Sequence, residues 1–313
     1  MTTQLHKDLD AIPPAARGAI AAIGNFDGLH LGHQALVQRV QHMAGDLGAP
    51  AAVMTFEPHP REFFAPDAPP FRLTLLPMKQ RVLAAWGVNH LFTVPFNAAL
   101  ASLSPEAFID DILVAHFGLR HIVVGHDFAF GKGRAGNVDT LRAAAAAGKF
   151  GLTVVDPVNC PDGSAYSSTR IRQHVQKAEF AEAEALLGRP FEIEAPVVHG
   201  DKRGRELGYP TANQQAGRYV RLPYGIYAVS VLVEGEKLWR AGVANFGVRP
   251  MFRIEQPIFE SFIFEFSGDI YDKQVRVRPL KYLRGEAHFD SLEALKDQMN
   301  RDCLEARAVV KSS

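Results

Sequence analysis

Cysteine is scarce in this chain, and charge of neither sign is in excess. Among 313 residues there are two cysteines, Cys160 and Cys303, which lie far apart and form no C-x-x-C pair. This spacing argues against a disulfide framework and a cysteine-rich metal site, and it favours a reducing cytoplasm. Lys and Arg together number 34, and so do Asp and Glu. A balanced charge provides no global field for nucleic acid or for a membrane surface.

Long apolar runs are missing as well. No stretch of the sequence reaches the length that spans a bilayer. The first ten residues, M-T-T-Q-L-H-K-D-L-D, are polar and lack the apolar core of a signal peptide. We therefore expect a cytoplasmic protein without nucleic-acid or membrane partners, in which any nucleotide site is local.

The length and the apolar content of 47% are sufficient for two domains with substantial cores. In the first half, short apolar runs alternate with longer amphipathic segments, which predicts a parallel α/β sheet covered by helices. After a first strand that starts at Ile20, strands are expected at 51–56, 90–94, 121–125 and 152–155. Helices are expected at 34–47, 77–86, 105–117 and 138–147. Ligands of such sheets lie beyond the carboxyl ends of the strands.

The stretch that organises this half is I-A-A-I-G-N-F-D-G-L-H-L-G-H, residues 20–33. An apolar strand breaks at a glycine-rich turn and delivers His30 and His33 to the start of a helix. Free N–H groups and the helix dipole make such a turn an anion site. The spacing fits neither G-x-G-x-x-G nor a P-loop. A capped helix with two surface histidines is the alternative, and metal ligation lacks a convincing third ligand.

Later strands are also followed by polar loops. Residues 125–137 contain four glycines, two cations, Asp127, Phe128 and Phe130, a set that suits a phosphate and a flat ring. Residues 166–172, Y-S-S-T-R-I-R, open a helix in which Ser168 and Thr169 can cap and two arginines bring charge. By itself this segment is typical of an ordinary cap followed by solvated arginines.

Beyond a short helix at 180–187, helical spacing of apolar residues gives way to alternation, so we place a domain boundary near 187. Apolar alternation predicts strands at 191–198, 225–233, 237–246, 258–266 and 274–283, which indicates an antiparallel sheet or small barrel. An amphipathic helix at 291–309 closes the chain. Between the first two strands lies H-G-D-K-R-G-R-E-L-G-Y-P-T-A-N, residues 199–213. A cationic glycine loop followed by the oxygen ligands Thr211 and Asn213 is a layout for Mg²⁺-dependent phosphoryl transfer.

The motif G-N-F-D-G-L-H-L-G-H and the order of the later loops resemble the bacterial FAD synthetase module over residues 18–187. The resemblance implies a Rossmann-like nucleotidyltransferase domain that transfers AMP from ATP to FMN, with Mg²⁺ carried by the triphosphate. It makes His30 and His33 donors at the α-phosphate and Asp127, Phe128 and Phe130 flavin contacts. The expected phosphate-binding residues of this half are Gly24, Phe26, Asp27, Gly28, Ser168, Thr169, Arg170 and Arg172.

The second half resembles the riboflavin kinases. It carries P-T-A-N, P-Y-G-I-Y-A, G-V-A-N-F-G-V-R-P and E-S-F-I-F-E-F-S-G-D-I-Y in the family's order. The resemblance makes Glu260 the base that takes the ribityl proton, with Glu265 as the alternative if the strand register differs. It places ATP phosphates on Gly200, Lys202, Gly204, Arg205 and Gly208, and Mg²⁺ on Thr211 and Asn213.

Two positions depart from the kinase pattern, Met251 and Asp272, where the family usually has Thr and Gly. They bear on flavin affinity rather than on the phosphate or metal residues. The chain as a whole resembles a bifunctional riboflavin kinase/FAD synthetase, with domains 1–187 and 188–313. A chain with one active half and a non-catalytic flavin-binding protein are the alternatives. The sequence leaves the number of assembled chains open.

Overall fold

The computed structural model describes residues 2–7, 9, 11–199, 209–248 and 257–311. Its contacts divide the chain into two compact units. The first contains Met1–Ala68 and Leu76–Ser167, and the second contains Pro69–Leu75 and Ser168–Ser313. Among the described residues no helix is both long enough and apolar enough to cross a membrane.

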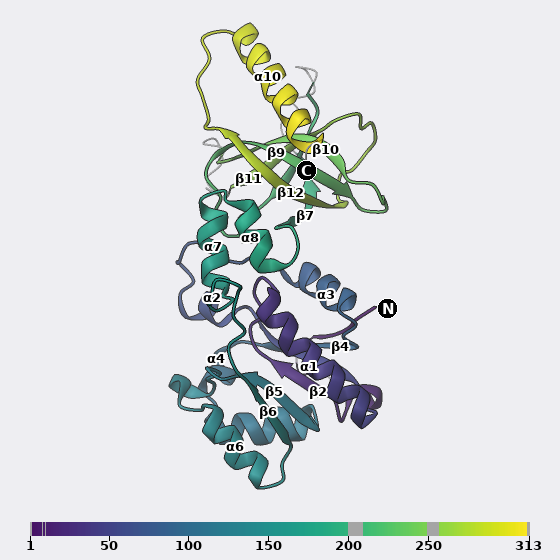
Figure 1. Cartoon of the computed structure of the whole chain (residues 1–313), viewed down its shortest axis with the longest axis vertical. Helices are drawn as coiled ribbons and strands as arrows, with labels where there is room; N and C mark the ends of the chain where they lie inside the picture. Colours follow the sequence, from purple (N-terminus) through teal and green to yellow (C-terminus); the bar gives the residue numbers. More distant parts are fainter. Residues whose placement is uncertain (1, 8, 10, 200–208, 249–256, 312–313) are drawn as a thin grey trace. The chain divides into compact units, whose positions relative to one another are not determined.

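The first unit is built on a parallel sheet (Figure 1). Its described strands are β1 (Gln4–Lys7), β2 (Ile20–Ile23), β3 (Ala51–Glu57), β4 (His90–Pro95), β5 (His121–Gly125) and β6 (Gly151–Val155). Their order in space is β1-β4-β3-β2-β5-β6. The chain moves outward from β2 to β4 and then returns to the other side of β2. The topological switch point therefore lies between the carboxyl ends of β2 and β5, where ligands of open α/β sheets bind.

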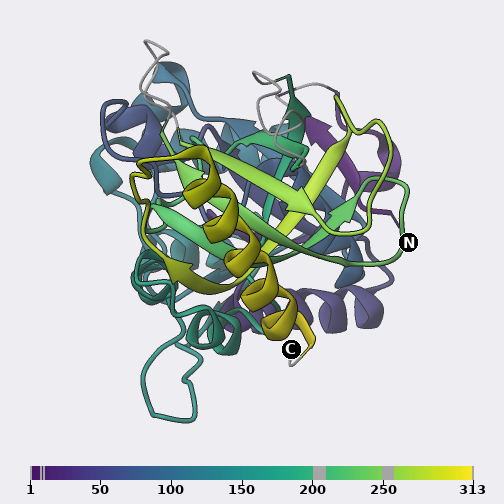
Figure 2. The same cartoon turned by 90° about the horizontal axis from the view of Figure 1, so that it is seen from above.

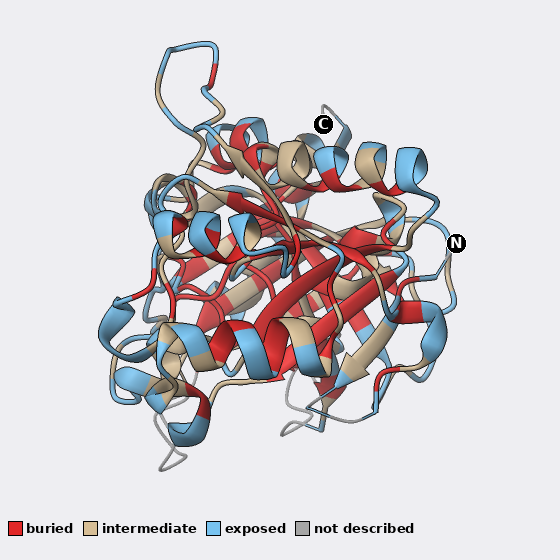
Figure 3. Cartoon of the chain, turned by 90° about the horizontal axis from the view of Figure 1, so that it is seen from below, coloured by how far each residue is buried: buried red, intermediate tan, exposed pale blue. Residues whose placement is uncertain are grey.

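Alternate residues of each strand feed two separate cores. Ile20 and Ala22 pack with α1 (Leu31–Leu47) and α3 (Leu76–Ala85) on one face. Ala21 and Ile23 pack on the other face with α6 (Val138–Ala146) and with Phe108–His116, a π-helix. Burial on both faces explains why the strands are continuously apolar. Figure 3 shows the sheet strands largely buried and the outer faces of the helices exposed.

Shorter elements complete the first unit. They are the 3₁₀ turns η1 (Pro14–Ala16) and η3 (Lys132–Arg134) and the helices α2 (Pro60–Phe64), α4 (Ala98–Ser102) and α5 (Pro105–Ala107). The helix expected at 105–117 is present but is mostly a π-helix, in which the amide of Phe117 donates to the carbonyl of Ile112 at 3.0 Å. Strand β1 was not expected, because most of its residues are polar. It lies at the sheet edge beside β4.

The second unit is a closed antiparallel barrel preceded by two helices and followed by one. The helices are α7 (Ser168–Gln176), α8 (Phe180–Leu187) and α10 (Leu292–Lys311). The described strands are β7 (Ile193–Val198), β8 (Thr211–Gln215), β9 (Gly225–Val233), β10 (Arg240–Gly247), β11 (Ile258–Ile263) and β12 (Gln274–Arg284). They close in the order β10-β11-β8-β7-β12-β9. Helix α10 lies across β9, β10 and β12 (Figure 2), with Ala306 in a small core beneath it.

The predicted fold class is confirmed, but one barrel strand was missed. Strand β8 has the sequence T-A-N-Q-Q, which lacks the apolar alternation that marks the other strands. Its inward positions hold Ala212 and the fully buried Gln214, whose side-chain amide donates to the carbonyls of Ala195 and Val275. A buried polar residue of this kind, which bonds to β7 and to β12 beyond it, carries no periodic signal.

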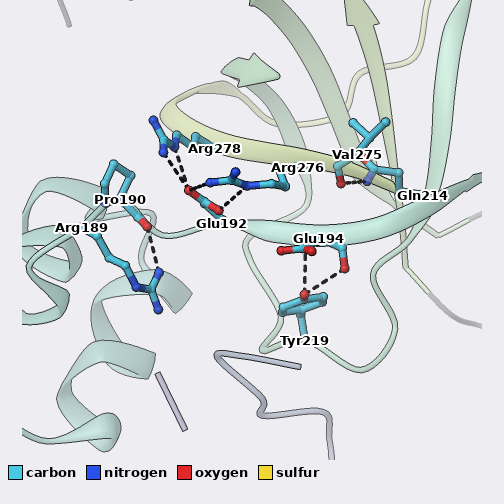
Figure 4. A network of polar contacts seen from close by, with 9 residues as sticks. All are labelled: Arg189, Pro190, Glu192, Glu194, Gln214, Tyr219, Val275, Arg276 and Arg278. Atoms are coloured by element: carbon cyan, nitrogen blue, oxygen red, sulfur yellow. Dashed lines mark hydrogen bonds and ion pairs between the residues drawn. The ribbon is translucent and has the colours of Figure 1, made fainter. Parts of the chain in front are cut away.

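Ion pairs and one tyrosine fasten β7 to the rest of the second unit (Figure 4). The buried carboxylate of Glu192 accepts forked bonds from Arg276 and Arg278, at 2.8 to 3.0 Å. The Tyr219 hydroxyl donates to the carbonyl of Glu194 at 3.0 Å and accepts from its amide at 3.1 Å. Bidentate Arg–carboxylate geometry is the strong form of such a pair.

The segment Pro69–Leu75 comes from the first half of the sequence but packs into the second unit. Arg72 is 1% exposed and forms a β-bridge with Tyr219, and its carbonyl accepts from the amide of Val220 at 2.8 Å. The chain therefore crosses between the units more than once.

Candidate functional site

The turn after β2 is held by residues with left-handed backbone. Phe26 and Leu29 have φ +48°, and Gly28 has φ +89°. A positive φ is unfavourable for Phe and Leu, yet both side chains are almost fully buried in the core beneath the turn. Asp27 is buried as well, at 3% exposure. Packing therefore imposes the shape of this turn and places it at the switch point beside β5.

The two histidines of the motif stack at the N-terminus of α1. Their ring centroids are 3.7 Å apart with 19° between the planes. His30 is the N-cap, and its Nδ1 accepts from the amide of His33 at 3.3 Å. An accepting Nδ1 places the His30 proton on Nε2, so this ring offers an N–H donor.

His33 is held in its neutral form. Burial lowers its pKa well below the usual value, and the charges of His30 and Lys79 lower it further. Among the described residues its Nδ1 is buried with no hydrogen-bond partner. A buried polar atom of this kind is suited to a ligand contact.

Gly32 allows this pair to form. A Cβ at this position would lie 3.1 Å from the His30 ring and 3.1 Å from Cβ of Tyr166. These distances are shorter than ordinary contacts, so a side chain would displace the His30 ring. The x of H-x-G-H is Leu31, and the glycine is required by packing rather than by its backbone angles.

Lys79 is a component of this site that the sequence did not reveal. Its side chain is fully buried, and Nζ donates to the carbonyl of Asn25 at 2.7 Å and to Oγ1 of Thr55 at 3.0 Å. Asn25 belongs to the turn after β2. The available signal was a charged residue on the apolar face of α3, in line with Leu76 and Leu83.

The expected flavin residues after β5 have different environments. Phe130 is buried in the core beside Phe108, with ring centroids 5.4 Å apart. Phe128 is half-buried and stacks on Phe130 at 5.5 Å, and Asp127 is exposed. Phe130 therefore supports Phe128 rather than presenting its own face.

An aromatic cluster beyond the carboxyl ends of β3 and β4 was not expected. Phe64 is 68% exposed, and its ring packs edge-on against Phe63 and Phe96 at 5.2 and 5.6 Å. Nothing in the periodicity separates it from a core phenylalanine, because α2 is a single short turn that the motif T-F-E-P-H-P precedes.

The segment Ser168–Arg170 begins α7, which the contacts group with the second unit, whereas the histidine pair belongs to the first. Arg172 donates from Nε to the carbonyl of Phe71 at 2.8 Å, and its guanidinium lies 5.2 Å from the Phe71 ring. This arginine thus holds the 69–75 segment.

In the second unit, strand register gathers polar residues around Glu260. Glu260 on β11 lies opposite Asn213 on β8 and opposite Asn245 on β10. Thr211, two residues before Asn213, lies opposite Phe262. Residues two apart on a strand share a face, so the two predicted metal ligands and the predicted base come together.

A cavity of about 430 Å³ opens on this face. Thr211, Asn245 and Glu260 line it from the barrel, and Met299 and Cys303 line it from α10. The Asn245 Oδ1 is buried and has no hydrogen-bond partner among the described residues. Asn245 was missed because only the barrel register places it beside Glu260.

The alternative base, Glu265, has a different environment. Glu265 follows the end of β11, has φ +54°, and its carboxylate accepts from Arg307 at 3.0 Å. Asp272, which replaces the family's usual glycine, has φ +61°, and its amide donates to the carbonyl of Val197 at 2.9 Å. Asp tolerates this left-handed conformation better than most residues, so the turn forms without glycine.

Ion pairs and hydrogen bonds link residues that line the cavity to α10. Arg284 makes a forked ion pair with Asp302, with distances of 2.9 and 2.6 Å. The Tyr209 hydroxyl donates to Oδ1 of Asn300 on α10 at 2.7 Å, which fixes the start of the P-T-A-N segment. The predicted phosphate loop residues Gly200, Lys202, Gly204, Arg205 and Gly208 lie outside the described residues, as does Met251.

Known protein families match the two halves of the chain separately. A family model described as FAD synthetase matches residues 12–170, and one described as riboflavin kinase matches residues 187–310. A protein of Pseudomonas fluorescens named "Bifunctional riboflavin kinase/FMN adenylyltransferase" is 44% identical and covers 99% of both chains. A Bacillus subtilis protein of the same name is 37% identical over 92% of this chain and 91% of its own.

Solved structures include a likeness over nearly the full length. A crystal structure described as a macrolide-efflux protein from Streptococcus pneumoniae is 32% identical and has a TM-score of 0.80. The match covers 98% of this chain and 99% of that one. The whole fold, rather than one half of it, is shared.

Proposed function

Because the chain belongs to the family of bifunctional riboflavin kinase/FMN adenylyltransferases, we propose how its residues divide the two reactions. The chain phosphorylates riboflavin with ATP to FMN, and it transfers AMP from ATP to FMN to give FAD and pyrophosphate. Family models match both halves, which disfavours one active half or a non-catalytic flavin carrier. We assign adenylylation to residues 1–187 and phosphorylation to 188–313. The cytoplasmic location stays a prediction.

The adenylylation site is proposed at the switch point of the parallel sheet. The observation that supports it is the stacked histidine pair at the N-terminus of α1, with a donor at His30 Nε2 and His33 kept neutral. Charge builds on the α-phosphate as the FMN phosphate attacks, and fixed donors stabilise it. The turn that contains Gly24, Phe26, Asp27 and Gly28 holds the nucleotide phosphates.

Three further assignments complete this half. Ser168, Thr169, Arg170 and Arg172 bind the departing pyrophosphate. Asp127 and the half-buried Phe128 contact the flavin, with Phe130 as the ring that supports Phe128. Both groups of residues stay predictions, and exposed Phe64 offers a second flat surface at the same edge of the sheet.

The phosphorylation site is proposed at the cavity between the barrel and α10. Glu260 takes the proton from the ribityl hydroxyl, and the register that joins it to Asn213 and Asn245 supports this role. The donor set also suits Mg²⁺, since the Thr211 hydroxyl and the Asn213 amide oxygen are hard oxygen ligands. When bound with ATP, Mg²⁺ neutralises phosphate charge. Gly200, Lys202, Gly204, Arg205 and Gly208 stay predicted phosphate-binding residues.

A time course tests both halves together. Purified protein is incubated with riboflavin, ATP and Mg²⁺, and the flavins are separated over time. FMN should appear first and FAD after it. Glu260→Gln should lower phosphorylation about 10²- to 10⁴-fold, as expected for loss of a general base, and leave adenylylation of supplied FMN intact. Glu265→Gln is the matched control, and His30→Ala should remove only adenylylation. Loss of both activities in a folded single variant would contradict the division.

A further inference from the structure

Lys79 has an unusual environment for a lysine. Its side chain is 0% exposed, and the residues around it on α3, Met78, Val82 and Leu83, are core residues. Lysine is rarely fully buried, because desolvation of an ammonium is strongly unfavourable unless fixed polar groups surround it.

Lys79 makes contacts at the carboxyl ends of β2 and β3. Its Nζ donates to the carbonyl of Asn25 at 2.7 Å, and this carbonyl also accepts from Oγ1 of Thr55 at 3.0 Å. Oγ1 of Thr55 accepts from Nζ in turn, at 3.0 Å. Asn25, Thr55 and Lys79 therefore form a closed triangle of hydrogen bonds. This triangle fastens the turn between Gly24 and Gly28 from beneath.

The charge of Lys79 also reaches the histidine pair. The groups that face His33 are His30, through stacked rings, and Lys79, and both lower the pKa of His33 in addition to its burial. The carboxylate of Glu57 lies 3.9 Å from Nζ and faces Lys79 from the end of β3. A neutral histidine donates hydrogen bonds but carries no net positive charge to balance a triphosphate. The buried ammonium of Lys79 provides a fixed positive charge beneath the turn after β2.

We propose that Lys79 is a positioning residue for adenylyl transfer, which holds the Gly24–Gly28 turn in shape beneath the phosphates. Its ammonium acts through the Asn25 carbonyl and through its field, without touching the reacting atoms. In this proposal the histidine pair donates hydrogen bonds, and the fixed ammonium stabilises the anionic substrates from below. The proposal concerns only the first unit, so riboflavin phosphorylation by the same chain is an internal control.

The experiment compares Lys79→Gln and Lys149→Gln in the full chain. Lys149 is the matched control, because it is a lysine of the same unit that pairs with exposed Asp110. Adenylylation of supplied FMN and phosphorylation of riboflavin are measured from pH 5.5 to 9 in one preparation, where the range brackets the ordinary titration of histidine at about 6.5. For Lys79→Gln we expect adenylylation kcat to fall about 10- to 100-fold and phosphorylation to stay unchanged.

The pH profile separates positioning from mere packing. Burial and His30 are the larger causes of the lowered pKa of His33, and Lys79 lowers it further. Loss of the ammonium removes this last contribution, so the acid limb of adenylylation should move to higher pH. Lys149→Gln should show neither effect. An unchanged rate, or a lowered rate with an unmoved acid limb, overturns the proposal.

Thr55→Val provides a second test that keeps the charge and does not depend on the folding of Lys79→Gln. It removes one corner of the triangle at nearly constant volume. We expect a several-fold loss of adenylylation with the acid limb in place. Wild-type adenylylation in Thr55→Val would contradict the role of the triangle.

Discussion

Replacement of Gly32 by alanine tests whether close packing of the histidine pair is required for adenylylation. Gly32 and Gly45 both lie in α1, and neither needs a positive φ. For both, alanine gains about 0.5–1 kcal/mol of intrinsic helix stability over glycine. A Cβ at Gly45 would meet nothing within 4 Å, whereas at Gly32 it would lie 3.1 Å from the His30 ring and from Tyr166. Gly45→Ala is therefore the matched control.

The two variants should differ in sign. Gly45→Ala should raise the free energy of unfolding by about 0.5–1 kcal/mol. Gly32→Ala carries an overpacking cost of about 1–3 kcal/mol, which outweighs the helix gain. Relief of the contact requires the His30 ring to move by a few tenths of an ångström. The bond from the His33 amide to His30 Nδ1 is already 3.3 Å long, so we expect a ring movement away from the helix start to break it.

The assay measures adenylylation of supplied FMN, phosphorylation of riboflavin and urea unfolding for both variants. Gly32→Ala should lose about 10- to 100-fold in adenylylation kcat, because displaced donors no longer meet the α-phosphate. Its phosphorylation should remain at the wild-type rate. Full adenylylation in Gly32→Ala, or an equal loss in Gly45→Ala, would refute the argument.

Two other predictions concern stability. The lowered pKa of His33 means that the unfolded chain binds its proton more readily, so stability should fall as pH drops below about 6.5, by up to about 1.4 kcal/mol per pH unit for this residue. Urea unfolding of the wild type against His33→Gln tests this, and equal slopes with pH would exclude it. A fragment of residues 168–313, which keeps α7 and α8, should unfold at lower urea than the barrel of the full chain, since it lacks Arg72 and the segment that pairs with Tyr219. Equal midpoints by circular dichroism would show that this segment is dispensable.

Much of the fold could be predicted, because the spacing of apolar residues along a segment indicates which of its faces are buried. Strands β2 to β6 are apolar on both faces, and most strands of the barrel alternate between apolar and polar residues. Their positions were therefore predicted to within a few residues. The elements that were missed, β1, β8, α2 and α4, are polar or a single turn long. Their placement depends on partners distant in sequence. Gln214 illustrates this, because its buried side chain is paired through the carbonyls of two other strands.

Local sequence by itself determined the chemistry that spacing along one segment can carry. The spacing of three residues between His30 and His33 brings the two rings together at the start of one helix. In P-T-A-N, the spacing of two residues places two oxygen donors on one face of a strand. Tertiary structure alone decided what surrounds them. Lys79 reaches the turn at Asn25 from another helix, and Asn245 and Glu260 meet across a barrel ladder. The physical reason is that burial and register are properties of contacts between distant segments, which no pattern within a single segment records.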